Sequence, residues 1–200
     1  MTTFGAVLCD VDGVLRLWDA DAMSTVDREF GLVGGTLAGA AFREARLGPA
    51  IVGQVTDAGW RSGVAEDLAE VCGSVERAGE VVAAWTLISG EVDQAVKEIL
   101  SGLRGKVPVG LVSNATTRLE DDLRALGVMD AVDFVVSSAR VGVAKPDAGI
   151  YLAAAREAGV PPQECLFIDD TEANIVGARA VGMTGVHYRR IADLTAVGLW

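Results

Sequence analysis

The chain has 200 residues, half of them hydrophobic, and a formal net charge of −11 at pH 7. This length predicts one domain, or one domain with a small accessory unit, and the hydrophobic content excludes wholesale disorder. The acidic balance argues against a general nucleic-acid-binding protein, although a pocket can still hold an anionic small molecule.

Apolar runs alternate with helical patterns along the chain. Five almost continuously apolar runs predict strands of a parallel sheet that is covered on both faces. These runs lie at residues 4–9, 107–112, 133–137, 165–168 and 184–188. Helical patterns lie between them, at residues 91–105, 116–127, 147–159 and 172–182. The alternation predicts a doubly wound, Rossmann-like α/β core.

Two local patterns predict helix starts within this core. Thr117 and Glu120 have the spacing of a capping box. Pro146 suits the first position of a helix, because its missing N–H is not needed there.

The connection between the first two strands is far longer than an ordinary crossover. Helical patterns within it lie at residues 20–31, 56–73 and 74–85. We expect Phe42, Trp60 and Trp85 to form a small core there. A helical unit inserted after the first strand would overhang the C-terminal edge of the sheet, where such folds bind ligands. We therefore predict an α/β catalytic core at residues 1–15 plus 89–200 and a helical cap at residues 16–88.

Cysteine usage and hydropathy bear on the compartment. Cys9, Cys72 and Cys165 are odd in number and form no C-x-x-C pair, which is typical of reduced thiols. Asp10 interrupts the first apolar stretch, no basic segment precedes it, and the longest uncharged runs are too short and Gly-rich to span a bilayer. We expect a cytoplasmic protein that does not enter a membrane.

Polar side chains stand directly beyond four of the predicted strands. They are Asp10 and Asp12 after the first strand, Ser113 and Asn114 after the second, Lys145 in the loop after the third, and Asp169 and Asp170 after the fourth. Each feature alone is common in loops and helix caps, but four in order, each after its strand, make coincidence improbable. The chain has a single histidine, His187, which we interpret as a packing or surface residue. Catalysis should therefore fall to carboxylates.

Clustered carboxylates repel one another unless a cation lies between them, and their hard oxygen atoms suit Mg²⁺. Mg²⁺ that is held by few protein ligands keeps positions open for a phosphate oxygen. A carboxylate can then attack phosphorus and form an aspartyl phosphate. Ser113 is placed to hold phosphoryl oxygens, and Lys145 to balance their charge. A second carboxylate two residues along the chain is placed to exchange a proton with the leaving group and with water.

The sequence is similar, over nearly its whole length, to the haloacid dehalogenase-like hydrolase superfamily. The similarity is to the phosphatase branch of subfamily IA type, which carries a helical cap after the first motif. "DVDGVL" resembles the family's D-x-D-G-[TV]-L motif, and "LVSNAT" its hydrophobic-[ST]-N motif. "AKPDAGIY" resembles the K-P-D-x-x-x-[FY] motif, and "FIDDTEANIVGARAVGM" the acidic fourth motif with its trailing helix.

The resemblance implies a role for each matched residue. Asp10 would be the nucleophile, and Asp12 the general acid/base. Ser113 and Asn114 would bind the phosphoryl group, and Lys145 would stabilise its charge.

The resemblance also implies a metal site. Asp10, the backbone carbonyl of Asp12 and the carboxylate of Asp170 would bind Mg²⁺, with Mn²⁺ as an alternative. Asp169 would be a further ligand or a neighbour that supports the ligands, and Asn174 would orient the site.

Three other functions use similar residues. A 2-haloacid dehalogenase also has an aspartate nucleophile, but it lacks an aspartate two residues on, so Asp12 and Asp170 favour phosphate esters. Phosphonate hydrolysis needs a cap lysine, and Lys97, Lys106 and Lys145 all lie outside the predicted cap. A phosphosugar mutase would share the core motifs.

The alternative from another class is a non-catalytic module that is phosphorylated or binds a ligand, as a receiver-like domain does. Such domains carry their acidic pair at the first strand, whereas Asp169 and Asp170 come last here. They also lack an inserted cap.

We expect a small phosphorylated metabolite as the substrate and a monomer or small homo-oligomer as the working unit. In the predicted cap, Arg43, Arg46 and Gln54 either face the substrate or face solvent, and the second placement is favoured. Trp18 either lines the entrance or packs against the cap hinge.

Overall fold

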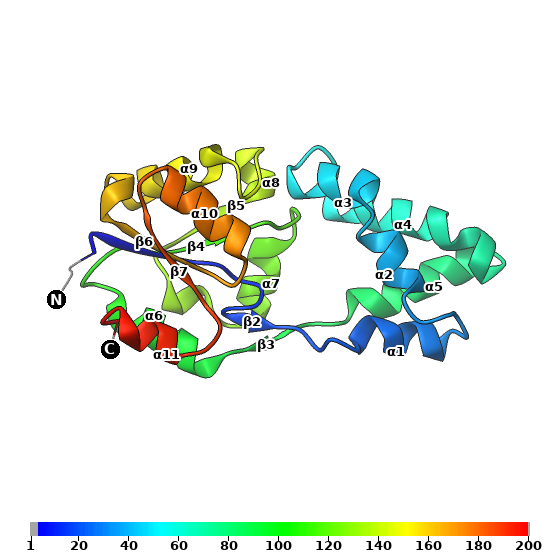
Figure 1. The fold of residues 1–200 in the computed structure, drawn as a ribbon. Helices are drawn as coiled ribbons and strands as arrows, with labels where there is room; N and C mark the ends of the chain where they lie inside the picture. Colours follow the sequence, from blue (N-terminus) through cyan, green and yellow to red (C-terminus); the bar gives the residue numbers. More distant parts are fainter. Residues whose placement is uncertain (1–3, 200) are drawn as a thin grey trace.

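The computed structural model describes residues 4–199 of the chain. Its centre is a parallel sheet with the strand order β5-β4-β1-β6-β7 (Figure 1). The strands are β1 (Ala6–Cys9), β4 (Val109–Ser113), β5 (Phe134–Ser137), β6 (Cys165–Asp169) and β7 (Thr184–His187). They match the five predicted runs apart from their end residues, and the doubly wound α/β fold is confirmed.

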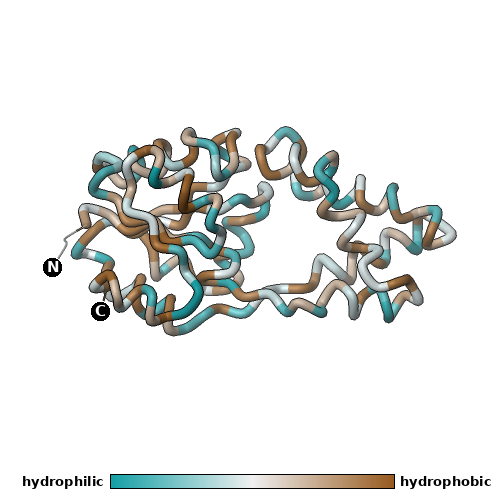
Figure 2. Tube along the Cα trace, viewed as in Figure 1, coloured by the Kyte–Doolittle hydropathy of each residue, from teal (hydrophilic) through white to brown (hydrophobic). Residues whose placement is uncertain are grey.

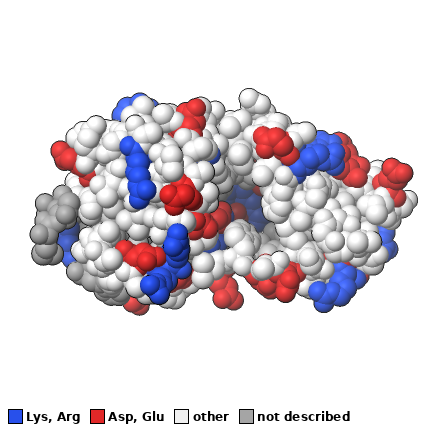
Figure 3. All heavy atoms as spheres, in the orientation of Figure 1, with Lys and Arg blue, Asp and Glu red and all other residues white. Residues whose placement is uncertain are grey.

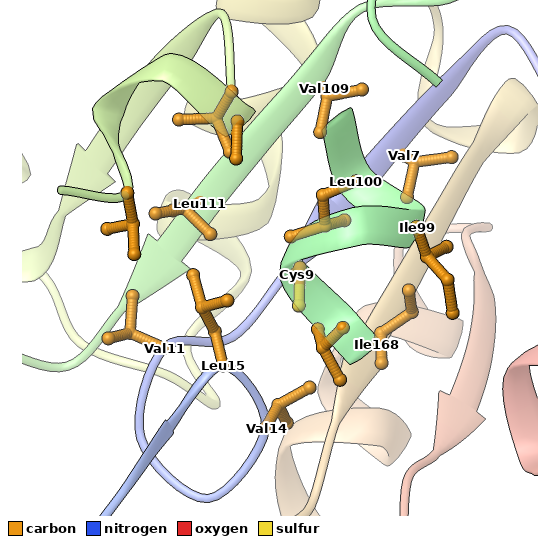
Figure 4. Packing of buried hydrophobic residues seen from close by; sticks show 14 of the residues in the cluster. Val7, Cys9, Val11, Val14, Leu15, Ile99, Leu100, Val109, Leu111 and Ile168 are labelled. Atoms are coloured by element: carbon orange, nitrogen blue, oxygen red, sulfur yellow. The ribbon is translucent and has the colours of Figure 1, made fainter. Parts of the chain in front are cut away.

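Helices cover both faces of the sheet because side chains of each buried strand alternate between the faces. Val7 and Cys9 of β1 join one hydrophobic cluster and Leu8 joins the other (Figure 4). On the first face lie α6 (Gln94–Leu103), α7 (Leu119–Ala125) and α11 (Ala192–Ala196). On the second face lie α9 (Ala148–Ala158) and α10 (Glu172–Ala180). Figure 2 shows the strands between them as largely hydrophobic.

Three predicted helix starts differ from the structure. Asp147 caps α9 by accepting from Gly149 N at 2.7 Å, so Pro146 precedes the cap. The capping box is also wrong, since α7 has no side-chain cap and Thr117 Oγ1 accepts from Asp57 N at 3.0 Å instead. The helix predicted from residue 91 begins at Gln94, because Glu91 and Val92 form β3.

The core also contains three shorter helices. They are α8 (Ser138–Val141), η1 (Met129–Ala131) and η2 (Pro162–Glu164).

Five helices between β2 and β3 form a separate unit, here called the helical insert (Figure 1). They are α1 (Ala22–Glu29), α2 (Thr36–Ala41), α3 (Glu44–Ile51), α4 (Asp57–Cys72) and α5 (Val75–Thr86). Trp60 and Trp85 are buried in its own cluster with their rings 5.0 Å apart and nearly perpendicular. The prediction for Phe42 is wrong: the residue is 53% exposed and lies outside the buried cluster, with its ring 6.5 Å from that of Trp60 at the edge of the cluster.

A short antiparallel ribbon joins the insert to the sheet. It consists of β2 (Arg16–Leu17) and β3 (Glu91–Val92), so it straddles the boundary predicted at residues 15 and 89. The insert also approaches α8 through Gly53, whose backbone lies against the carbonyl of Ala139. The division into a core and a cap stays a prediction, and residues 1–3 and 200 of the predicted core lie outside the described residues.

Among residues 4–199, no helix is both long enough and apolar enough to cross a bilayer.

Candidate active site

Four adjacent strands, β5, β4, β1 and β6, bring the predicted polar residues to one edge of the sheet. β1 lies between β4 and β6, so the chain segments that follow these strands are neighbours. They surround a pocket of about 650 Å³, and Figure 3 shows charged side chains around the hollow between the sheet and the helical insert. Its lining consists of Asp10, Asp12, Gly13, Leu17, Trp18, Ser113, Asn114, Lys145, Asp170, Thr171 and Asn174. Asp169 lies beneath this lining and is fully buried.

Lys145 connects two buried carboxylates, Asp10 at the floor of the pocket and Asp169 beneath it. Its Nζ lies 2.8 Å from Asp10 Oδ1 and 2.7 Å from Asp169 Oδ2. The loop that carries Lys145 is fixed to β4, because Asn114 accepts from Lys145 N at 2.7 Å and donates to its carbonyl oxygen at 2.9 Å. These two hydrogen bonds fix the backbone of Lys145 and therefore the position of its ammonium group relative to the Asp10 and Asp169 carboxylates.

Burial and the neighbouring charges both shift the pKa values of Asp10 and Lys145. Burial raises the pKa of Asp10 above the usual carboxyl range, the ammonium of Lys145 lowers it, and the charge of Asp169 raises it again. Burial by itself would lower the pKa of Lys145, but the two carboxylates outweigh it and raise that pKa. An additional cation beside Asp10 would favour its charged form.

Asp169 and Asp170 have different surroundings although they are adjacent. Asp169 accepts from Lys145, from Asn174 Nδ2 at 3.0 Å and from Thr171 N at 2.8 Å. Its oxygen atoms are therefore engaged by protein donors. Asp170 is exposed and accepts from the Thr171 hydroxyl at 3.3 Å. Of the two, Asp170 is the one whose carboxylate is exposed to the pocket and can accept an external ligand.

Gly13 makes room for the Asp170 carboxylate. It has φ +83°, and a Cβ at this position would lie 2.1 Å from Asp170 Oδ2. Both the backbone conformation and the close approach require glycine. The glycine of "DVDGVL" thus sets the distance between the loop after β1 and the loop after β6.

The carboxylates fit a hard divalent cation. Asp10, Asp169 and Asp170 each offer an oxygen atom, and these atoms lie within 4.8 Å of one another. Asp10 and Asp170 line the pocket and Asp169 lies beneath it, and oxygen donors at this spacing suit Mg²⁺.

Asp12 is held by two side chains that the sequence analysis did not assign to it. Arg16 Nε donates to Asp12 Oδ1 at 2.7 Å and Nη2 to Oδ2 at 3.1 Å, while Trp18 Nε1 donates to Oδ1 at 2.7 Å. Trp18 therefore lines the pocket and contacts Asp12 as well. An arginine four residues after an aspartate in a turn is a pattern that could have pointed to this pair.

His187 lies on β7 beside the loop after β6 and is not among the residues that line the pocket. Its Nε2 is 2.8 Å from the carbonyl oxygen of Asp170, and its Nδ1 is 2.6 Å from the carboxylate of Glu172. The register pairs His187 with Asp169 across β6 and β7, which explains this position.

The polar residues of the insert do not reach the pocket lining. Arg46 makes a two-pronged ion pair with Asp67 at 2.9 and 2.8 Å, and Arg43 lies 3.2 Å from the same carboxylate. Gln54 is exposed. The two arginines are engaged within the insert.

Solved structures with this architecture include enzymes of one superfamily. The chain resembles a HAD family enzyme from Bacteroides thetaiotaomicron, solved with magnesium and inorganic phosphate, with a TM-score of 0.77, 24% identity and coverage of 98% of this chain and 99% of that chain. It also resembles the L-2-haloacid dehalogenase of Xanthobacter autotrophicus, with a TM-score of 0.66, 19% identity and coverage of 99% and 85%. At these identities the likeness bears on the fold alone.

Curated relatives include phosphatases. The chain is 44% identical to a phosphatase of Mycobacterium tuberculosis over 61 residues, 30% of this chain and 28% of that protein. It is 26% identical to a sesquiterpene phosphatase of Aspergillus oryzae over 193 residues, 93% of this chain and 90% of that protein. Of the first relatives, the chain spans only 28% of the Mycobacterium phosphatase and 39% of a haloacid dehalogenase-like hydrolase domain-containing protein of Xenopus laevis.

A model of the haloacid dehalogenase-like hydrolases matches residues 4–182, which is most of the chain. The chain therefore belongs to the haloacid dehalogenase-like hydrolase family.

Proposed function

We propose that this protein is a Mg²⁺-dependent phosphatase of small phosphate monoesters that acts through an aspartyl phosphate at Asp10. One observation carries the proposal. The buried Asp10 carboxylate stands beside a fixed ammonium group, at the floor of a pocket that Asp12, Ser113 and Asp170 also line. The phosphatases among the relatives support the same reaction.

The reaction proceeds in two steps. A carboxylate oxygen of Asp10 attacks phosphorus, the ester P–O bond breaks, and the leaving oxygen takes a proton from Asp12. Water then gives a proton to Asp12 and attacks the same phosphorus. The acyl phosphate bond breaks, inorganic phosphate leaves, and the Asp10 carboxylate is restored.

Polar groups around Asp10 hold the phosphoryl group. Lys145 balances the negative charge that the phosphoryl oxygens bring beside Asp10. Ser113 and Asn114 stand at the end of β4 and donate to the same oxygens.

The metal would be held by the carboxylates of Asp10 and Asp170 and by the carbonyl oxygen of Asp12. Asp169 supports them through Lys145 and Asn174 rather than as a main ligand, because protein donors already engage its oxygen atoms. When bound, Mg²⁺ neutralises charge on the phosphoryl oxygens and favours the ionised form of Asp10. Mn²⁺ would serve in the same place.

The helical insert acts as the cap of this site. Leu17 and Trp18 of the connecting ribbon line the pocket, and the insert continues from this ribbon, so we infer that it restricts the site to a small phosphorylated metabolite. The acidic surface does not suit nucleic acid. A cytoplasmic location and a monomer or small homo-oligomer remain part of this proposal.

Other reactions of the family fit the site less well. A dehalogenase does not need an acid at the position of Asp12 or a metal ligand at that of Asp170. A phosphosugar mutase would use the same residues but would return the phosphoryl group to a sugar. A non-catalytic phosphorylated module would retain phosphate on Asp10.

The test is phosphate release from sugar phosphates, nucleoside monophosphates and 4-nitrophenyl phosphate, with Mg²⁺, with chelator, and in the variant Asp10→Asn. We expect metal-dependent release that the variant abolishes while its fold persists, since Lys145 keeps its bond to Asp169. Release that continues undiminished in Asp10→Asn would remove this residue as the nucleophile. No release from any ester would reject the phosphatase and leave the mutase or the binding module.

A further inference from the structure

We propose that Arg16 and Trp18 are positioning residues that fix the Asp12 carboxylate for proton transfer to the leaving group. The inference rests on the proposed function, because it assumes that Asp12 is the general acid of a phosphatase. It concerns two residues that follow the first motif and touch neither the phosphoryl-binding residues nor the metal-binding carboxylates by any hydrogen bond in residues 4–199.

The two donors leave Asp12 with one oxygen atom free to exchange a proton. Oδ1 accepts from Arg16 Nε and from Trp18 Nε1, each at 2.7 Å, which occupies both of its lone pairs. Within the described part of the chain, Oδ2 accepts only the longer bond from Arg16 Nη2, at 3.1 Å. A substrate oxygen would therefore exchange its proton with Oδ2.

Arg16 can hold the Asp12 carboxylate in place because its own side chain is buried and makes ion pairs. Its side chain is 7% exposed, whereas that of Asp12 is 37% exposed, so the pair is held from the protein side and open on the pocket side. Taking a guanidinium group out of water is costly unless carboxylates compensate it. The Asp12 carboxylate compensates the charge of Arg16, and the Asp122 carboxylate of α7 lies 3.7 Å from Arg16 Nη1.

Backbone hydrogen bonds fix the distance between Asp12 and Arg16. Gly13 N donates to the carbonyl oxygen of Arg16 at 2.9 Å, and Arg16 N donates to that of Val11 at 2.7 Å. These bonds close a tight turn with Asp12 and Arg16 at its two ends. Because the guanidinium fork is planar, it fixes the plane of the carboxylate as well as its position.

Trp18 adds a second constraint from the pocket side. Its ring lies 4.6 Å from the Arg16 guanidinium carbon, a cation–π contact, while its indole N–H points to Asp12. Trp18 is 46% exposed. Replacing it by phenylalanine removes the indole donor without opening the core.

The test exploits the fact that only a poor leaving group needs a general acid. Rates of the first turnover would be measured for 4-nitrophenyl phosphate, whose phenolate leaves unprotonated, and for the alkyl phosphate that the protein hydrolyses fastest. The variants are Arg16→Gln, Arg16→Lys and Trp18→Phe. The control is Arg124→Gln on α7, an exposed arginine that pairs with Asp121. Unfolding temperatures would be recorded for all.

General acid catalysis contributes about 10²–10⁴-fold to such steps, so a mispositioned acid forfeits part of that factor. We expect Arg16→Gln to lose on the order of 10–100-fold with the alkyl ester and less than about threefold with the aryl ester. Arg16→Lys should recover part of the loss. Trp18→Phe should shift the alkyl-to-aryl ratio in the same direction by about threefold or more, and Arg124→Gln should not change it.

Equal losses with both esters in Arg16→Gln and Trp18→Phe would overturn the inference and leave the phosphatase intact. If Arg16→Gln does not fold, the ratio in Trp18→Phe decides alone. Failure of the unsubstituted protein to release phosphate from either ester would overturn the proposed function together with the inference.

Discussion

The ammonium group of Lys145 donates to the carboxylate of Asp169 at 2.7 Å, and the two side chains are 1% and 0% exposed. The same nitrogen lies 2.8 Å from Asp10, so one cation compensates two buried anions. When both carboxyl groups are ionised, the pocket floor carries a net negative charge, and burial and Asp169 raise the pKa of Asp10 against that state. A divalent ion beside Asp10 would favour its ionised form.

Lys145→Met should strongly destabilise the protein because it leaves the Asp10 and Asp169 carboxylates buried without their shared cation. We expect a loss of about 3–5 kcal/mol in the free energy of unfolding at pH 7, measured by urea denaturation without Mg²⁺. The exposed Lys106→Met serves as control and should stay within about 0.5 kcal/mol. A loss below about 1 kcal/mol in Lys145→Met would contradict this account of the charge balance.

Gly13→Ala should weaken metal binding, because its Cβ would lie 2.1 Å from Asp170 Oδ2. The matched control is Gly105→Ala, where φ is +77° and a Cβ meets nothing within 4 Å. Both variants should lose about 1 kcal/mol of stability from backbone strain. Only Gly13→Ala should need a higher Mg²⁺ concentration for half-maximal phosphate release. Equal Mg²⁺ dependence in the two variants would show that Gly13 does not set the position of Asp170.

Mg²⁺ should raise the unfolding temperature of the protein, since the proposed site forms from the carboxylates only in the folded chain. At 100 times the dissociation constant the expected stabilisation is about 2.7 kcal/mol. Asp170→Asn should abolish most of the shift, whereas Asp121→Asn, on an exposed pair of α7, should keep it. A shift that survives in Asp170→Asn would place the ion elsewhere.

Gly53→Ala should loosen the contact between the helical insert and α8. The new Cβ would lie 2.1 Å from the carbonyl oxygen of Ala139, whereas in the control Gly73→Ala, with φ +85°, it meets nothing within 4 Å. Hydrogen exchange should accelerate for the amides of residues 138–142 in the first variant only. Unchanged exchange there would mean that the insert can tilt without disturbing α8.

The ion pair between Arg46 and Asp67 should make the insert sensitive to acid. Arg46 lowers the pKa of Asp67 in the folded protein. The pair therefore stabilises the fold above the ordinary carboxyl pKa, and this contribution is lost as the pH falls through the lowered value. We expect Asp67→Asn to cost about 1 kcal/mol at pH 7 and almost nothing at pH 2, measured by thermal unfolding. A deficit that is equal at both pH values would assign the effect to packing.

The sheet was predictable because its strands are buried on both faces and read as continuous apolar runs. The same reasoning placed Asp10, Ser113 and Lys145 near one another, since parallel strands end at a common edge. Their roles stay predictions until the variants are measured.

Contacts that depend on the conformation of a turn or on the register of a strand could not be predicted from the apolar runs. The pairing of Arg16 with Asp12 arises from a tight turn, and that of His187 with Asp170 from the register of β7 against β6. Phe42 lies at the edge of the insert's hydrophobic cluster. The hydrophobicity of a side chain does not by itself distinguish such an edge position from an interior one.

The central place of β1 has a kinetic consequence. Its partners β4 and β6 both come much later in the chain, after the helical insert, so the first strand has no sheet neighbour while the insert is being synthesised. Pairings between segments so distant in sequence form late, because a long loop must close before they gain contacts. During refolding, the insert should gain its helices before the carboxylates converge, and binding of the divalent ion should mark the last stage of sheet assembly.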